Sequence, residues 1–293
     1  MDQAEQLRNI VKMQSIPRSV SRVITVTSGK GGVGKTSIAV NLALQLQRMG
    51  KKVVILDADF GLANIEVMLG VRPTANLADL MFRGRALTDI VMPGPEGIGF
   101  ISGGSGIKEL TSLKRDQIFY VMQSLTELDN IADIVLVDTG AGIAESVLDF
   151  AAASEEILLV VTPEPTSITD AYALLKTLNR TKEFEAERTV IKLIANRVNN
   201  QQEGQDIFYK LSTVAEKFLN IQLEYLGAVV NDESVSKAII QQKPLLISHP
   251  SSAASNAIRE LVDTLEGEEV IKKDEGKGIK KLFTSLIHAK MRK

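Results

Sequence analysis

The chain has 293 residues, 44% of them hydrophobic, and a formal net charge of −2. A chain of this length and composition can bury a large core, and its repeated strand and helix signals favour one α/β domain over two. It contains no cysteine, which excludes disulfides, thiolate metal sites and cysteine-held iron–sulfur clusters and suits a cytosolic protein. The polar N-terminus does not resemble a signal peptide, and no apolar run reaches the roughly 18 residues of a membrane-spanning helix.

The first element that we expect is a short helix ahead of any strand. It lies in DQAEQLRNIVKMQ, residues 2–14, where Asp2 can act as the N-cap and Glu5 completes a capping box. Pro17 bounds the segment. The apolar residues that recur at helical spacing are Ala4, Leu7, Ile10 and Val11. Residues 1–20 are therefore predicted to form a helix and a linker outside the sheet, the alternative being an ordinary docked or frayed terminal helix.

A glycine-rich loop follows the first predicted strand. Residues 23–27 (VITVT) are a β-branched run typical of a buried parallel strand, and SIAVNLALQLQRM after the loop has helical spacing. Residues 29–36 between them read G-x-x-x-x-G-K-T, the phosphate-loop pattern, whose backbone N–H groups and lysine bind phosphates and whose threonine can ligate Mg²⁺. The alternative is a glycine-rich turn that binds no phosphate. The residues expected to contact a nucleotide here are Gly29, Lys30, Gly31, Gly32, Val33, Gly34, Lys35, Thr36 and Ser37.

Six further runs have the composition of buried strands, and helical patterns fill most of the gaps between them. The runs lie at residues 53–57, 99–102, 134–138, 157–162, 189–196 and 225–230. Such alternation predicts an α/β fold with a mostly parallel sheet of about seven or eight strands and helices on both faces. Right-handed crossovers then place the loops after the strands on one edge of the sheet, where ligands bind.

Three aspartates fall at the ends of predicted strands on that edge. Asp138 closes IVLVD, and Asp57 and Asp59 close the second strand in LDADFGLAN. An acid after an apolar strand is the usual second half of a phosphate-loop site, where it holds Mg²⁺ directly or through water. Together with Thr36, Asp57 and Asp138 are the expected metal-site residues. For each acid, the alternative is a solvated helix cap or turn residue.

The motifs KGGVGKT, VVILDADFGLAN and LVDTGAG together resemble the deviant-Walker-A ATPases, the MinD/ParA or signature-lysine family. The resemblance implies slow hydrolysis of ATP with Mg²⁺ by a protein that dimerises face to face when loaded with ATP. It also implies the catalytic residues: Lys30 would reach the phosphates of the other subunit, Lys35 those of its own, and Asp59 would position the attacking water. The alternative is that Lys30 only decorates the loop.

The segment ANRVNN indicates which nucleotide base the site binds. Asn196 stands at the end of a predicted strand, where the family uses Asn-Arg to hydrogen-bond adenine, and no N-K-x-D guanine pattern occurs in the chain. ATP is therefore favoured over GTP. The stretch AVVNDESV, residues 228–235, resembles the family's loop on the far side of the adenine. The base-contacting residues that this implies are Asn196, Arg197 and Val230.

What the chain lacks narrows the choice among members of this family. Nitrogenase iron proteins, arsenite-pump ATPases and iron–sulfur carriers need cysteines, and the tyrosine kinases carry a C-terminal tyrosine cluster, whereas the last tyrosine here is Tyr225. MinD-like proteins on membranes and ParA-like proteins on DNA remain. The acidic body and the lack of an evident helix-turn-helix argue against DNA as a partner. An ATP-dependent amide-forming ligase also stays open, although no second substrate signature is found.

The last residues, 277–293 (KGIKKLFTSLIHAKMRK), predict a basic amphipathic helix. They carry about +6 with no acid, which leaves about −8 on the remainder of the chain. Such a tail fits an anionic membrane surface, and its expected contacts are Ile279, Leu282, Phe283, Leu286, Ile287, Lys280 and Lys281. Residues 21–265 would then form the ATPase domain and 266–276 a polar linker. The alternative is a last helix docked on the protein's own core.

The N-terminal DQA-x-x-LR resembles the activation motif of the FlhG (YlxH) group of MinD-like ATPases. The resemblance implies a regulator of flagellar number and placement that binds the FlhF GTPase, stimulates its GTP hydrolysis and is peripheral on the cytoplasmic face of the membrane in the ATP state. The implied partner-binding residues are Asp2, Gln3, Ala4, Leu7 and Arg8. Flagellar switch components are further partners of the group, and nothing in these residues selects among them.

Overall fold

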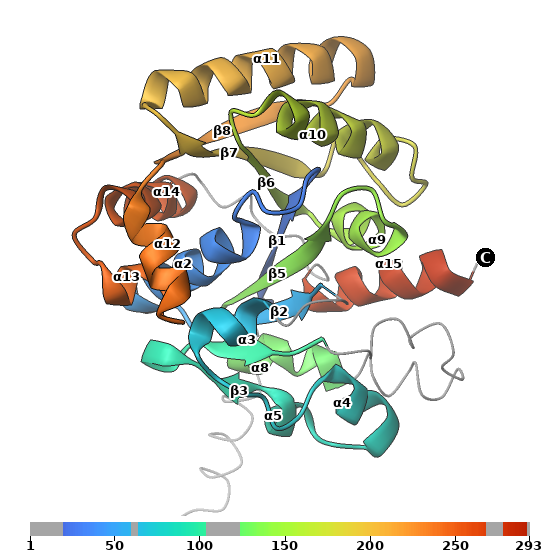
Figure 1. The fold of residues 1–293 in the computed structure, drawn as a ribbon. Coiled ribbons are helices and arrows are strands. Elements are labelled where there is room, and N and C mark those ends of the chain that lie inside the picture. Colours follow the sequence, from blue (N-terminus) through green and yellow to red (C-terminus); the bar gives the residue numbers. More distant parts are fainter. Residues whose placement is uncertain (1–19, 60–63, 104–123, 268–277, 292–293) are drawn as a thin grey trace, which may run out of the picture.

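The computed structural model describes residues 20–59, 64–103, 124–267 and 278–291. Its centre is an eight-stranded sheet with the order β3-β4-β2-β5-β1-β6-β7-β8 (Figure 1). All neighbouring strands are parallel except β3 and β4, which are antiparallel. The strands are β1 Arg22–Ser28, β2 Val53–Ala58, β3 Met92–Pro93, β4 Gly99–Ile101, β5 Ile134–Ala141, β6 Glu156–Val161, β7 Val190–Val198 and β8 Leu223–Val230.

All seven predicted strands are present, and the predicted α/β fold is confirmed. The added strand, β3, was not predicted because it has two residues, one of them a proline, and so carries no period-2 pattern. It extends the sheet at the β4 edge by pairing Met92 with Phe100 and Pro93 with Gly99.

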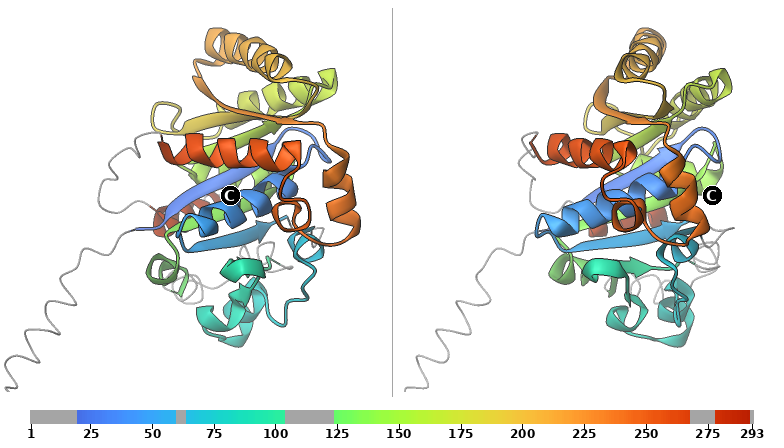
Figure 2. Two further views of the ribbon diagram at one scale, coloured as in Figure 1. Left: turned by 90° about the vertical axis from the view of Figure 1, so that its left-hand side faces the viewer. Right: turned by 60° about the vertical axis from the view of Figure 1, so that its left-hand side comes forward.

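Helices cover both faces of the sheet, as two further views show (Figure 2). One face carries α2 Lys35–Arg48, α3 Asn64–Leu69, α12 Glu233–Ile240, α13 Leu245–Ser248 and α14 Ala253–Gly267. The other carries α4 Leu77–Arg83, α5 Leu87–Ile90, α8 Leu128–Ile131, α9 Glu145–Ala153, α10 Pro165–Leu178, α11 Gln201–Leu219 and α15 Ile279–Met291. A short 3₁₀ turn, η1 Pro95–Gly97, precedes β4. Within the described residues, no helix is long and apolar enough to cross a bilayer.

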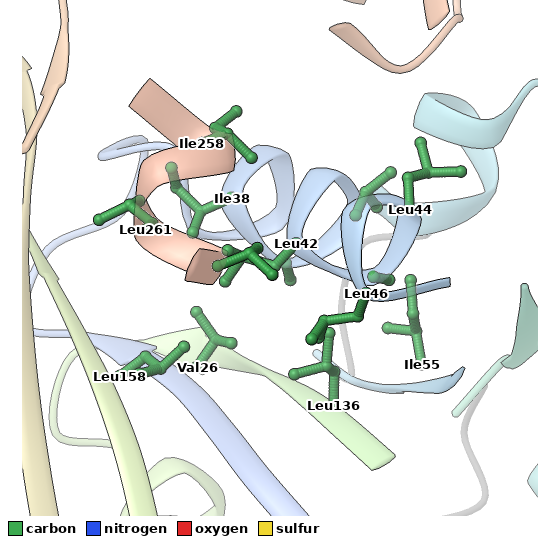
Figure 3. Packing of buried hydrophobic residues seen from close by; sticks show 14 of the residues in the cluster. Val26, Ile38, Leu42, Leu44, Leu46, Ile55, Leu136, Leu158, Ile258 and Leu261 are labelled. Atoms are coloured by element: carbon green, nitrogen blue, oxygen red, sulfur yellow. The ribbon is translucent and has the colours of Figure 1, made fainter. Parts of the chain in front are cut away.

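The strands pack on both faces because alternate residues along each strand enter opposite layers. On the α2 face, Val26 of β1, Leu136 of β5 and Leu158 of β6 belong to one buried cluster. Helix α2 lays Ile38, Leu42 and Leu46 on this layer, and α14 closes it from the side with Ile258 and Leu261 (Figure 3). The helix that follows the phosphate loop is thus held by this buried cluster, which fixes the loop in place.

Helix α15 packs against the body of the protein, where an exposed membrane-binding face was expected. Its residues Ile279, Leu282, Phe283 and Leu286 are at most 4% exposed and belong to the same cluster as residues of β2 and β5. The Phe283 ring meets Phe150 of α9 edge to face, with centroids 6.5 Å apart. Lys281 forms a 3.0 Å ion pair with Glu155, and Lys280 is exposed.

The docked helix matches the alternative given for residues 277–293, a last helix packed on the protein's own core, and membrane binding by this segment stays a prediction. Periodicity specifies an apolar stripe but not its partner, and here the partner is the groove between α9 and the sheet. The side chain of Ile287 lies outside the described residues. The predicted N-terminal helix, with Asp2, Gln3, Ala4, Leu7 and Arg8, also lies outside them, as does most of the linker after α14.

Candidate active site

The phosphate loop joins β1 to α2 at the carboxyl edge of the sheet. It runs beside α10, and a Cβ on Gly29 would lie 2.1 Å from the backbone carbonyl carbon of Asp170, so only glycine fits there. Lys35 is the first residue of α2 and is 8% exposed. The free N–H groups and positive end of a helix therefore point into the loop, which makes it a site for an anion.

Gly34 and Asn196 interlock at the end of this loop. Gly34 is the N-cap of α2 with φ of +97°, a conformation that favours glycine, and a Cβ there would lie 2.4 Å from Asn196 Nδ2. The Asn196 amide donates a 2.7 Å hydrogen bond to the Val33 carbonyl, and its Oδ1 accepts from the Arg197 N–H. Asn196 therefore fixes the phosphate loop, and its predicted contact with adenine stays a prediction.

Asp57, near the end of β2, and Asp138, within β5, lie side by side on neighbouring strands. Their Cα atoms are register partners in the parallel ladder, and the two residues are 3% and 1% exposed. Neither oxygen of Asp138 has a hydrogen bond of good geometry among the described residues, and the groups that favour its charge are the Lys35 ammonium and the Thr36 hydroxyl. A buried carboxylate without a partner is costly unless a cation or a proton accompanies it.

Burial raises the pKa of both carboxyl groups. It brings the pKa of Asp57 to about 8, with added repulsion from Asp138, Asp59 and Glu66 and an opposing hydrogen bond from the Asp59 N–H. It brings the pKa of Asp138 to about 6, against the stabilising charge of Lys35. A raised pKa means that the charged form of the carboxylate is unfavourable here. A divalent cation bound by these oxygens would reverse that cost.

The donor set at this edge fits Mg²⁺. No group of three or more acidic or histidine side chains in the described part of the chain could enclose a metal by itself. Mg²⁺ is commonly held by one or two carboxylates with water and substrate phosphates completing the shell. Asp138 and the nearby Thr36 hydroxyl meet that description, with Asp57 beside them. The three residues expected to hold the metal thus lie near one another, and their role in binding Mg²⁺ stays a prediction.

Asp59 directly follows β2 and lies near Gly140, in the last part of β5. Its N–H donates a 3.0 Å hydrogen bond to Asp57 Oδ1, and its own Oδ2 accepts from Asn64 of α3 at 3.2 Å. A Cβ on Gly140 would lie 3.6 Å from Asp59 Oδ1. The carboxylate therefore faces the same edge as the phosphate loop, as expected.

Lys30 points away from the loop and contacts its own chain. Its amine forms an ion pair with Glu164 and donates a 2.8 Å hydrogen bond to the Thr166 hydroxyl. The hydrogen bond from Lys30 to Glu164, together with the Lys30 charge, holds the pKa of Glu164 below its usual range, and the charge of Arg197 adds to the effect. The Lys30 side chain is 35% exposed, so it lies at the surface of the nucleotide edge and not inside the phosphate cradle.

Comparison with known proteins places this site in a family. The ParA family, described as NUBPL iron-transfer P-loop NTPase, matches residues 19–266. The antiactivator FleN of Pseudomonas aeruginosa is 42% identical over 245 residues, which cover 84% of this chain and 86% of that protein. The chain belongs to the MinD/ParA family. The flagellum site-determining protein YlxH of Helicobacter pylori is 32% identical to this MinD/ParA protein, and the match covers 98% of each chain.

Solved structures agree with this placement. The MinC:MinD cell division protein complex of Aquifex aeolicus includes a chain that superposes with a TM-score of 0.65 at 26% identity, covering 87% of this chain and 100% of that one. As a MinD/ParA-family ATPase, the chain binds ATP with Mg²⁺ and hydrolyses ATP. It shares the phosphate-loop fold of the iron-transfer members but has no cysteine with which to hold an iron–sulfur cluster.

The remaining base-side residues of this MinD/ParA ATPase lie on neighbouring strands. Arg197 is exposed with φ of +59°, and Val230 ends β8 half-buried. Ser37 stands in the first turn of α2, where its carbonyl accepts a 2.7 Å bond from Asn41. The roles of Arg197, Val230 and Ser37 toward a nucleotide stay predictions.

Sequence reasoning missed the partners of the two most important side chains, Glu164 for Lys30 and Asn64 for Asp59. The sequence does contain a hint of Glu164, because this acid stands between two prolines shortly after the apolar strand β6. Asn64 had none, since asparagine at the start of a helix is an ordinary cap.

The raised pKa of Asp57 predicts a pH dependence of stability in nucleotide-free, Mg²⁺-free protein. An aspartate whose pKa rises on folding is more easily protonated when folded, so stability is lost as the pH rises from about 4 to about 8. Asp57→Asn should remove much of that loss and melt at a higher temperature than the parent at pH 8, with little difference at pH 4.5. Thermal unfolding at the two pH values measures this, with exposed Asp263→Asn as the control. Equal melting of parent and Asp57→Asn at pH 8 would contradict it.

Proposed function

We propose that this ATPase is a nucleotide-controlled switch that regulates flagellar number or placement. In this proposal it dimerises on ATP, associates with the cytoplasmic face of the membrane, and binds and activates an FlhF-type GTPase. The observation that carries it is the similarity to YlxH along nearly the whole chain, together with the closer identity to FleN. Similarity over that length includes the regions before and after the ATPase core, where partner and membrane contacts are expected.

Each residue of the site has a role in the proposed reaction. Lys35 and the loop N–H groups would bind the phosphates, while Asp138 and Thr36 would hold Mg²⁺, which neutralises phosphate charge. Asp59 would orient a water for in-line attack on the γ-phosphorus and accept its proton. The bond from the γ-phosphorus to the bridging oxygen breaks as the new P–O bond forms, and ADP leaves with the electron pair.

Lys30 would complete the site from the other subunit of an ATP dimer. Its amine lies at the surface of the nucleotide edge and is held there by Glu164, itself exposed, rather than buried in its own loop. A cation placed in this way can exchange one anionic partner for another when a second subunit brings its phosphates. The charge would then stabilise the transferring phosphoryl group, as an arginine finger does.

Membrane binding would require α15 to leave its groove. Burial of each large apolar side chain of α15 stabilises the docked state by about 1.5–3 kcal/mol, and a lipid surface offers comparable burial. Burial in lipid would therefore offset part of the free energy lost when α15 leaves its groove. Basic residues add about 1 kcal/mol each near an anionic surface, and two tails in one dimer bind far better than one. ATP-driven dimerisation would shift the balance toward the membrane.

The test of the proposed function is GTP hydrolysis by purified FlhF, measured alone, with this protein, and with a variant lacking residues 1–15. Stimulation by the full chain that is lost with the deletion is expected. Arg8→Ala should lose much of the stimulation, whereas Lys12→Ala, a cation of the same segment outside DQA-x-x-LR, should keep it. No stimulation by the full chain would overturn the GTPase-activating role and leave an ATPase that positions another cargo. ATP-dependent, salt-sensitive DNA binding would then identify DNA as that cargo.

A further inference from the structure

The carboxylate of Asp59 has two oxygens in different surroundings. Oδ2 accepts a hydrogen bond from the amide of Asn64 at 3.2 Å. Oδ1 lies near Gly140, the last but one residue of β5, and a Cβ built on that glycine would be 3.6 Å from it, an ordinary van der Waals distance. One oxygen is thus held by a neutral donor, and the other is directed toward the carboxyl edge where the phosphate loop lies.

Asn64 stands on a helix that is itself fixed in place. It is the first residue of α3, whose Ile65 and Leu69 are 0% and 5% exposed. In the same turn, Glu66 accepts a 2.6 Å hydrogen bond from the hydroxyl of Ser102, directly after β4. Helix α3 is therefore anchored by its apolar side and by its first turn, so the Asn64 amide is presented from a defined position.

A second restraint reaches Asp59 from its own strand. The Asp59 N–H donates to Asp57 Oδ1 at 3.0 Å, which orients the backbone just beyond β2. The backbone bond fixes where the residue lies, and the Asn64 amide fixes how its carboxylate is turned. Without such a restraint, the rotation of an aspartate carboxylate about its last side-chain bond is broad and nearly two-fold, so its two oxygens would not keep fixed directions.

We propose that Asn64 is a positioning residue for ATP hydrolysis, which turns the Asp59 carboxylate so that Oδ1 meets the attacking water. This inference rests on the role of Asp59 in the proposed function. An amide suits the task because it donates a hydrogen bond without adding a charge beside a carboxylate that must work as an acceptor. Asn64 needs no contact with the nucleotide, so its loss should affect the chemical step and leave ATP affinity unchanged.

The test compares three substitutions of Asn64 in the full-length protein. If Asn64 only stabilised the start of α3, aspartate in its place would serve as well as asparagine. If Asn64 acts as the donor to Asp59, aspartate would be the worst replacement, because it brings an acceptor and a like charge in place of the amide. We expect kcat to fall by about ten- to a hundredfold in Asn64→Asp, by less in Asn64→Ala and least in Asn64→Gln, which keeps the amide. The ATP concentration for half-maximal rate should change less than threefold.

The controls separate this inference from the function on which it rests. Asn130→Asp, an exposed asparagine of α8, should leave kcat unchanged, and Asp59→Ala should lower it strongly. If Asp59→Ala lowers kcat while Asn64→Asp hydrolyses ATP normally, Asn64 has only a capping role and the inference is overturned. If Asp59→Ala itself has normal activity, the proposed role of Asp59 is wrong, whatever Asn64 does. A loss of ATP binding in Asn64→Asp would also overturn the positioning role.

Discussion

Asp59→Ala is expected to slow ATP hydrolysis by about a hundredfold or more and to leave an ATP-bound dimer that persists. The substitution removes the carboxylate that faces the nucleotide edge, but it leaves untouched the phosphate loop and the buried pair formed by Asp57 and Asp138. Binding and dimerisation should therefore survive while the chemical step fails. Phosphate release reports the rate, and light scattering behind a sizing column reports the dimer with ATP and with ADP.

A matched control for this variant is Asp263→Ala, which removes an exposed aspartate from α14. It should hydrolyse ATP at the parent rate. Normal hydrolysis by Asp59→Ala would show that another group activates the water. A monomer in the presence of ATP would show instead that the loop after β2 is needed for assembly.

Phe150→Ala is expected to increase nucleotide-independent binding to anionic vesicles. Phe150 lies in the groove, 1% exposed, and meets the ring of Phe283 edge to face. Truncating a buried phenylalanine costs about 3–5 kcal/mol. If about half of that loss weakens the docking of α15, the docking equilibrium shifts by about tenfold or more toward the undocked helix. The tail sequence itself is unchanged, so its affinity for lipid is preserved. Co-sedimentation with vesicles containing anionic lipid, with and without ATP, measures the effect.

The control for lost stability is Phe208→Ala on α11, which breaks an aromatic contact with Tyr225 away from α15. It should leave vesicle binding without ATP at the parent level. A Phe150→Ala protein that additionally lacks residues 278–293 should not bind, since the gain must come through the tail. Unchanged vesicle binding by a folded Phe150→Ala protein would contradict the idea that docking restrains the tail.

The parallel sheet was predictable from the sequence because its strands are buried on both faces. Runs such as VVILD and IVLVD are continuously apolar and end in aspartate, so they locate both a strand and the edge that it reaches. The phosphate loop was equally predictable, because few other loop conformations require glycines and a lysine at this fixed spacing. Its prediction in turn located Asp57, Asp138 and Asp59 at the same edge.

Contacts between distant segments were not predictable in this way. The sequence did not predict that the Asn196 amide holds the Val33 carbonyl. Lys30 was expected to project toward a second subunit, and in this chain its amine contacts Glu164 and Thr166. Each of these pairs is more than 130 residues apart in sequence. No local pattern reports such a meeting.

The sequence by itself determined the family, the order of strands and helices along the chain, and the positions of the phosphate loop and the acids at the nucleotide edge. These follow from local rules, since strand burial, helix periodicity and the glycine pattern of the loop are each specified by neighbouring residues. Only the tertiary structure decided that the apolar stripe of α15 lies against Phe150 and that Asn64 holds Asp59. An apolar stripe gains nearly the same free energy from any apolar partner, and a side-chain amide can donate to many different acceptors. The choice of partner is therefore made by the packing of the whole chain.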